Sequence, residues 1–160
     1  MVALVIGFAV LLAVSAHALP LRVASHFDAS GHPNGWTDRT SFLWLMGGVG
    51  FIFPALFVVL FVVMRFAPSL LILPDEGSFT AVPGLTLTYL LRRAFWFGTM
   101  TLCFMAAVQT LIIEANTATP PHLQTATLLV VLAGFTIGVM FWSISLLQNF
   151  SRARRVSQPA

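Results

Sequence analysis

The sequence predicts an all-α integral membrane protein, a bundle of four transmembrane helices with both termini on the cytoplasmic side. Three observations support this fold class. Of the 160 residues, 58% are hydrophobic and only 8% are charged, whereas soluble proteins average roughly 25% charged residues. Four long apolar runs contain no Asp, Glu, Lys or Arg. The arginines are also distributed unevenly among the segments that join these runs.

The composition excludes several classes of protein. A mean hydropathy of +0.93 leaves too few polar side chains to cover a water-soluble globule, so a soluble enzyme and a disordered chain are excluded. The net charge of +3 does not indicate nucleic-acid binding, because no cluster exceeds the three arginines near the C-terminus. A single cysteine excludes an intramolecular disulfide and a multi-cysteine metal site. The partner that the composition predicts is the lipid bilayer.

Each apolar run is long enough to be a membrane-spanning helix, because about 20 helical residues cross a bilayer core and lipid cannot satisfy backbone polar groups. The predicted spans are residues 2–18, 42–64, 94–113 and 126–147. They are joined by an outer loop (19–41), an inner loop (65–93), a second outer loop (114–125) and a cytoplasmic tail (148–160), all in one membrane domain, 1–160. The sequence does not define the first residue of the third helix, which could begin directly after Pro83-Gly84.

The first run admits a second interpretation, because Ser15-Ala16-His17-Ala18 resembles the cleavage site of a secretory signal. No Lys or Arg precedes this run, and Pro20 follows closely behind it. These two features favour a retained first helix.

Arginine placement predicts the orientation. Six of the eight arginines lie in the inner loop and the tail, and the segment 114–125 has none. The positive-inside rule makes the arginine-rich side cytoplasmic, so the segments 19–41 and 114–125 are expected to face outward.

Polar side chains with recognition chemistry are concentrated in the first outer loop, and they are His26, Asp28, Ser30, His32, Asn34 and Trp36. We expect two consecutive turns here, because Asp28 and Ser30 can accept hydrogen bonds from backbone amides and Gly31 can adopt a positive φ. Residues 33–35 fit a second tight turn. The pattern predicts a compact lid that recognises an external ligand through these six residues.

The same loop resembles a known family. Leu-Pro leaves the first helix at residues 19–20, and His-Phe-Asp-Ala-Ser-Gly-x-Pro-Asn-x-Trp follows at residues 26–36. This motif is similar to the domain of unknown function DUF1648, which also begins the SdpI-type bacterial immunity proteins. The resemblance covers about residues 2–53, and Arg39 stands near the position where the family often has Lys. It implies a multi-pass protein of the bacterial inner membrane with an immunity or signalling role.

Metal binding is an alternative for the loop, because imidazole and carboxylate groups suit Zn²⁺ and similar ions. His26, Asp28 and His32 are the candidate ligands, with His17 as a fourth. Their spacing is not a recognised ligand pattern, so we expect hydrogen bonds to the loop's own backbone and no cofactor. We expect His122 to be a solvated loop residue.

Inside the spans, three features concern helix packing. Gln109 is expected to form an interhelical hydrogen bond to a Ser or Thr of the fourth helix. Gly134-x-x-x-Gly138 fits a close helix crossing, either within the bundle or between two copies of a homo-oligomer. Pro54 is expected to kink the second helix in mid-membrane.

No catalytic motif is present, since nothing resembles a Ser-His-Asp triad, a phosphate-binding glycine loop or a paired-carboxylate site. We therefore expect a non-enzymatic protein that recognises a secreted peptide or an envelope component through residues 26–36. The alternatives are an accessory subunit that binds another membrane protein, such as a transporter, and a metal-dependent membrane enzyme.

Overall fold

The computed structural model describes residues 2–66 and 87–157. Most of the predicted inner loop 65–93 and the last three residues of the tail lie outside the described residues. Within the described parts, the element order is α1 (Val2–Ala18), β1 (Arg22–Phe27), β2 (Pro33–Asp38), α2 (Arg39–Phe66), α3 (Leu87–Thr117) and α4 (Thr125–Ser157).

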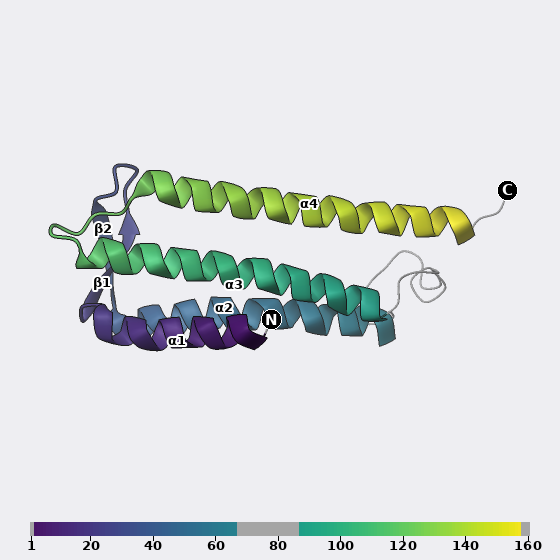
Figure 1. Cartoon of the computed structure of the whole chain (residues 1–160), viewed down its shortest axis with the longest axis horizontal. Helices are drawn as coiled ribbons and strands as arrows, with labels where there is room; N and C mark the ends of the chain where they lie inside the picture. The colour runs from purple at the N-terminus through teal and green to yellow at the C-terminus, as the bar shows by residue number, and fades with distance from the viewer. Residues whose placement is uncertain (1, 67–86, 158–160) are drawn as a thin grey trace.

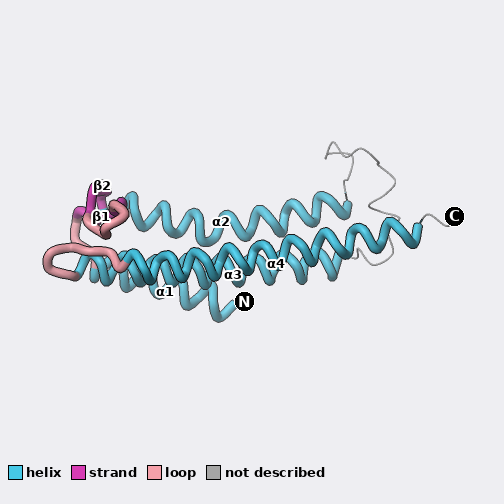
Figure 2. The backbone as a smooth tube through the Cα atoms, turned by 90° about the horizontal axis from the view of Figure 1, so that it is seen from above, coloured by secondary structure: helices cyan, strands magenta, loops and turns pink. Residues whose placement is uncertain are grey.

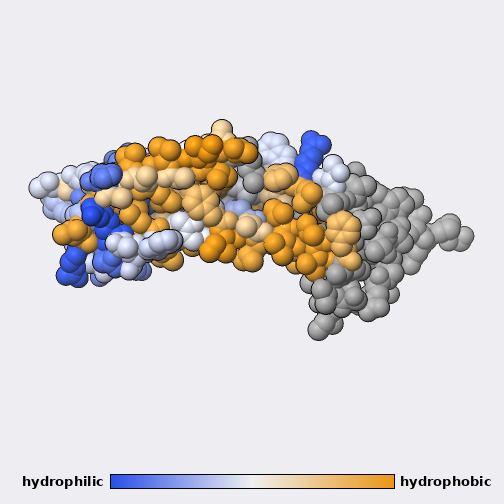
Figure 3. Space-filling view, turned by 90° about the horizontal axis from the view of Figure 1, so that it is seen from below, coloured by the Kyte–Doolittle hydropathy of each residue, from blue (hydrophilic) through white to orange (hydrophobic). Residues whose placement is uncertain are grey.

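The four helices confirm the mostly helical membrane architecture. Among the described residues, three helical stretches are long and apolar enough to cross a bilayer, namely Arg39–Leu60, Thr88–Thr117 and Thr125–Asn149. The helix Val2–Ala18 is shorter and equally apolar in character. Figure 3 shows apolar side chains covering the middle of the bundle and hydrophilic ones gathered at the end that carries the two strands.

The helices α2, α3 and α4 extend beyond the predicted apolar runs, whereas α1 has the predicted bounds. α2 begins three residues early because Asp38 caps it, with its Oδ1 accepting a hydrogen bond from the Ser41 amide at 3.0 Å. α3 begins at Leu87 and includes Arg92 and Arg93, and α4 continues into the predicted tail. Pro54 lies inside α2, which the structure describes as one continuous helix.

The outer loop differs from the prediction, because it is a β-hairpin and not a pair of turns. β1 and β2 form a two-stranded antiparallel sheet in which Arg22 faces Asp38 and Ala24 faces Trp36. The turn between them contains Gly31 at φ 86°, the positive value expected for it. The fold therefore contains a small sheet and is not strictly all-α.

The helix α3 is the centre of the bundle. It lies between α4 on one side and the pair α1 and α2 on the other (Figure 1). Three aromatic rings connect three helices, with ring centroids 4.1 Å apart for Phe57 and Phe97 and 5.2 Å apart for Phe97 and Trp142. α4 is peripheral, because none of the residues in its most apolar 18-residue stretch is buried.

Both predicted outer segments lie at the same end of the molecule. The hairpin and the connection between α3 and α4 meet there, and α2 ends at the opposite end, where α3 begins (Figures 1 and 2). The functional candidates 26–36 are therefore gathered at one pole of the bundle.

Candidate functional site

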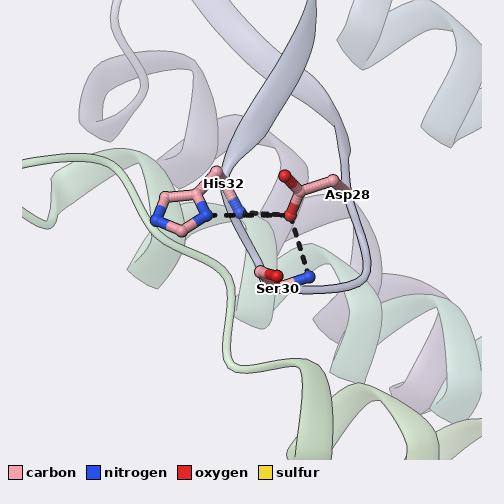
Figure 4. Close-up of polar contacts among 3 residues, drawn as sticks. All are labelled: Asp28, Ser30 and His32. Atoms are coloured by element: carbon pink, nitrogen blue, oxygen red, sulfur yellow. Dashed lines mark hydrogen bonds and ion pairs between the residues drawn. The ribbon is translucent and has the colours of Figure 1, made fainter.

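Asp28 organises the hairpin turn. Its Oδ1 accepts hydrogen bonds from the backbone amides of Ser30 and His32, both at 2.9 Å (Figure 4). The Asp28 amide donates to the His32 carbonyl at 2.9 Å, and the Gly31 amide donates to the Asp28 carbonyl at 3.0 Å. The sequence prediction that Asp28 binds backbone amides ahead of it is confirmed.

These contacts lower the pKa of Asp28 below its ordinary value of 3.8. The hydrogen bond from the His32 amide is the largest cause, and partial desolvation opposes it. The bond from the Ser30 amide and the nearby His32 imidazole add to the lowering, with His32 Nδ1 3.8 Å from Asp28 Oδ1. Asp28 is therefore ionised at neutral pH and stabilises the turn as an anion.

The tip of the hairpin is docked on the connection between α3 and α4. The Leu123 amide donates to the Gly31 carbonyl at 2.9 Å. The rings of His32 and His122 meet edge to face, with centroids 5.4 Å apart. His122 is exposed, as expected for a solvated loop residue. The expectation that it does no more than this is wrong, because its imidazole contacts the hairpin.

Asn116 of α3 holds the other side of the hairpin. Its Oδ1 accepts a hydrogen bond from the Ala24 amide at 2.8 Å, and its Nδ2 donates to the Ala24 carbonyl at 3.1 Å. The same Nδ2 donates to the Ile112 carbonyl at 2.9 Å. The Asn116 carboxamide thus satisfies both backbone groups of Ala24, which is 0% exposed. A neighbouring β-strand would satisfy them in the same way.

The base of the hairpin is held in a similar way. Arg39 Nη1 donates to the Leu19 carbonyl at 3.1 Å, and the Arg39 amide donates to the Leu21 carbonyl at 3.0 Å. Leu19 and Val23 are buried together with Phe42 and Ile112. Glu114 forms no ion pair with Arg22 or Arg39 among the described residues, where Asp28–His32 is the ion pair found.

An irregular register displays His26 on the outer surface. Ala24 faces Trp36 and His26 faces Gly35, so Ser25 is an extra residue on β1. The Ser25 hydroxyl lies 2.8 Å from Thr37 Oγ1 and 3.1 Å from His26 Nδ1. A Cβ at position 35 would lie 2.9 Å from the His26 Cβ. Only glycine at this position leaves room for the His26 side chain across β2.

The six predicted recognition residues therefore divide into two groups. Asp28, Ser30 and His32 lie at the turn, and His26, Asn34 and Trp36 lie on the strands; all six are exposed, Trp36 to 45%. Among residues 2–66 and 87–157, no three His, Cys, Asp or Glu side chains are grouped so as to hold a metal ion. The candidate set of His26, Asp28 and His32 thus does not converge in the described structure.

The helix-packing candidates are placed in different environments. Gln109 is fully buried, but neither its Oε1 nor its Nε2 has a hydrogen-bond partner among the described residues, so the expected bond to α4 is wrong. Gly138 faces the Met100 sulfur, 3.4 Å from the position of a Cβ, and Gly134 has nothing within 4 Å. Pro54 is buried within α2.

Sequence reasoning did not identify Asn116 or the contact between Gly31 and Leu123. A polar residue near the end of an apolar helix was the available signal for Asn116. Its partner Ala24 is 92 positions away in the sequence, so the contact itself depends on the tertiary fold.

Apolar helices with one polar, hairpin-bearing end define a multi-pass helical membrane protein. Residues 2–51 match the family model described as Domain of unknown function (DUF1648). This match confirms the resemblance over α1, the hairpin and the first part of α2. No curated protein and no solved structure matches the chain.

Proposed function

We propose that this protein is a non-enzymatic, four-span protein of the bacterial inner membrane, with both termini inside, whose hairpin recognises an extracytoplasmic ligand. The ligand would be a secreted peptide or an envelope component, and the role would be immunity or signalling as in the SdpI-type proteins. The observation that carries this proposal is a hairpin that is anchored to the helix ends and leaves His26, Asn34 and Trp36 exposed.

The length of α1 supports four spans. Its first residues line a hollow with Arg92 of α3, and Leu19, just after its end, packs with Ile112 of the same helix. At a rise of 1.5 Å per residue, the 20 residues between Arg92 and Ile112 correspond to about 30 Å, which is the thickness of a bilayer core. By the same geometry the 17 residues of α1 correspond to about 26 Å, so α1 covers most of this distance.

The anchoring supports recognition by a preformed surface. Asn116, Leu123 and Arg39 hold the hairpin at its edge, tip and base. A ligand that meets a surface held in this way does not have to order it, which reduces the entropic cost of binding.

The open edge of β2 supports an extended peptide as the ligand. In the described sheet β2 pairs only with β1, so its other edge presents unpaired backbone groups. A peptide strand can add to such an edge by backbone hydrogen bonds, and neighbouring side chains such as Trp36 then provide selectivity.

The test replaces the displayed residues without touching the anchors. The variant His26→Ala/Trp36→Ala should abolish the phenotype that the wild-type gene restores in a deletion strain, while its membrane level and thermal stability stay unchanged. Trp44→Ala is the matched control, because Trp44 is 77% exposed on α2 outside the hairpin. Full complementation by the double variant would refute the proposal.

A second candidate, an accessory subunit of a membrane complex, is favoured by the peripheral position of α4. This helix packs on α3, and Gly134 lines a hollow between the two helices in which an added Cβ would meet nothing within 4 Å. Small residues on an open helix face permit close approach of another helix. Native mass spectrometry after mild extraction would support this candidate if a stoichiometric second chain is bound. A homodimer that Gly134→Leu dissociates would support self-association instead.

A further inference from the structure

Two adjoining hollows lie at the end of the bundle opposite the hairpin. The larger, of about 640 Å³, lies between residues 2–6 of α1 and the side chains of Arg92, Phe95, Trp96 and Thr99 on α3. The smaller, of about 300 Å³, is lined by Tyr89, Arg92, Arg93 and Trp96. Arg92 and Trp96 line both, so an apolar groove continues into a basic, aromatic mouth.

The two arginines of the mouth are used differently. Arg93 is half-buried, and it donates from Nε to Tyr89 Oη at 3.1 Å and from Nη1 to Ser145 Oγ at 2.6 Å. Its backbone carbonyl accepts a hydrogen bond from Trp142 Nε1 at 3.0 Å. Arg92 is exposed and has no hydrogen bond or ion pair among the described residues.

The charge at this end is not balanced within the described residues. Asp28, Asp38 and Glu114, the acidic residues of the described parts, all belong to the hairpin end. Among the described residues Arg92 therefore has no acidic partner, and a guanidinium forms paired hydrogen bonds with a phosphate more readily than an ammonium group does.

The depth of the mouth matches the headgroup region of a bilayer. Arg92 lies about 30 Å along α3 from Ile112 by helix geometry, which places it at the boundary of the hydrocarbon core. The groove runs from this boundary along α1, where Val2, Leu4, Val5 and Ile6 provide an aliphatic wall. A ligand that fits both parts has an anionic head and a hydrocarbon chain.

We propose that this groove binds an anionic phospholipid of the inner leaflet. Its phosphate would pair with Arg92 at the mouth, and one acyl chain would lie between α1 and α3. Basic pockets between transmembrane helices on the cytoplasmic side bind anionic headgroups in this way, and the volume lies within the usual range for a ligand site. This site is separate from the hairpin, and its placement in the inner leaflet rests on the orientation in the proposed function.

The experiment measures lipid binding by native mass spectrometry of the full chain, titrated with phosphatidylglycerol or phosphatidylcholine of identical acyl chains. The wild type should prefer phosphatidylglycerol, and Arg92→Gln should weaken phosphatidylglycerol binding by about fivefold, as expected for the loss of one arginine near the surface. Arg22→Gln is the charge control, because Arg22 is exposed at the hairpin end opposite Asp38.

A second pair of variants separates the groove from general attraction of lipids to arginine. Ile6→Trp fills the groove and should weaken phosphatidylglycerol binding at least as much as Arg92→Gln does. Val14→Trp should have no effect, because Val14 is 55% exposed, similar to the 58% of Ile6, and lies outside the groove. Equal binding of the two lipids by the wild type would overturn the proposal. Equal losses in Arg22→Gln and Arg92→Gln, or unchanged binding in Ile6→Trp, would also overturn it.

Discussion

At the residue scale, Asn116 has the most specific structural role. Its carboxamide contacts the Ala24 amide and carbonyl at 2.8 and 3.1 Å, and so joins α3 to β1 across the polar end of the bundle. The carboxamides of asparagine and glutamine carry a donor and an acceptor side by side without a charge at any ordinary pH. The position of β1 on α3 therefore depends in part on one polar side chain whose contact a hydropathy profile does not reveal.

The variant Asn116→Ala should lower the free energy of unfolding by about 1–3 kcal/mol, because it leaves buried backbone groups of Ala24 without partners. SDS-induced unfolding in detergent micelles measures this change. Thr117→Ala is the control, since Thr117 Oγ1 donates only to carbonyls of its own helix. Equal stability of the two variants would contradict the anchoring role of Asn116.

Asp28 should titrate below 3.8, because hydrogen bonds from the His32 and Ser30 amides stabilise its anion. A depressed pKa in the folded state means that the contribution to stability is fully present above the unfolded-state pKa. It is lost as the pH falls through the lowered folded-state value.

Nuclear magnetic resonance of the Asp28 carboxyl carbon measures this titration. The amide shifts of Ser30 and His32 should follow the same midpoint, and in Asp28→Asn they should show no such step. A midpoint at or above 3.8 would show that the turn is not held by the ionised carboxylate.

At the element scale, the hairpin is a small sheet that cannot be stable by itself. Its stability comes from its contacts, with Asn116 along β1, the connection between α3 and α4 at the tip, and Arg39 at the base. These contacts cover one side of the hairpin and leave the edge of β2 available. The element that carries the recognition residues is thus positioned by the ends of the helices.

Gly31→Ala should separate the tip of the hairpin from its support. A side chain at φ 86° is strained by about 1–3 kcal/mol, and its Cβ would collide with the Leu123 carbonyl oxygen and the His122 ring. Thermal unfolding should shift accordingly. Gly134→Ala is the matched control with open space around it, and it should change the midpoint little. Equal midpoints for both variants would refute the docking of the tip.

At the scale of the whole molecule, the bundle has two chemically different ends. The hairpin end contains all the acidic side chains of the described residues, and the opposite end contains Arg92 and Arg93. α3 connects the two ends, so the proposed recognition surface and the proposed lipid site lie at opposite ends of the bundle. Each can be tested with variants that leave the other in place.

Cysteine labelling tests the orientation. In a Cys103→Ser background, a membrane-impermeant maleimide added to intact cells should label Ser30→Cys but not Arg154→Cys, because the positive-inside rule places Arg154 in the cytoplasm. Arg154→Cys should react only after the membrane is opened. Labelling of both positions from the outside would refute the proposed topology.

Hydropathy predicted the four helices because the cost of exposing backbone groups to lipid dictates helix wherever an apolar run is long enough. The helices extend beyond the apolar runs, since α2 starts at its Asp38 cap and α3 continues on both sides of its run. The turn chemistry of Asp28 and Gly31 was predictable from local residue types. The strands were not predictable, because apolar and polar residues do not alternate clearly along the six residues of β1. Its register with β2 is also irregular.

The sequence by itself determined that the chain enters a bilayer and which residues form its helices, and it predicts that residues 26–36 hold recognition chemistry. These properties depend on local composition and on the solvent around each segment. Only the tertiary structure decided that the loop is an anchored hairpin, that Asn116 and Leu123 hold it, and that Arg92 opens a groove beside α1. Those contacts join residues far apart in the chain, and their energies exist only when the helices are packed.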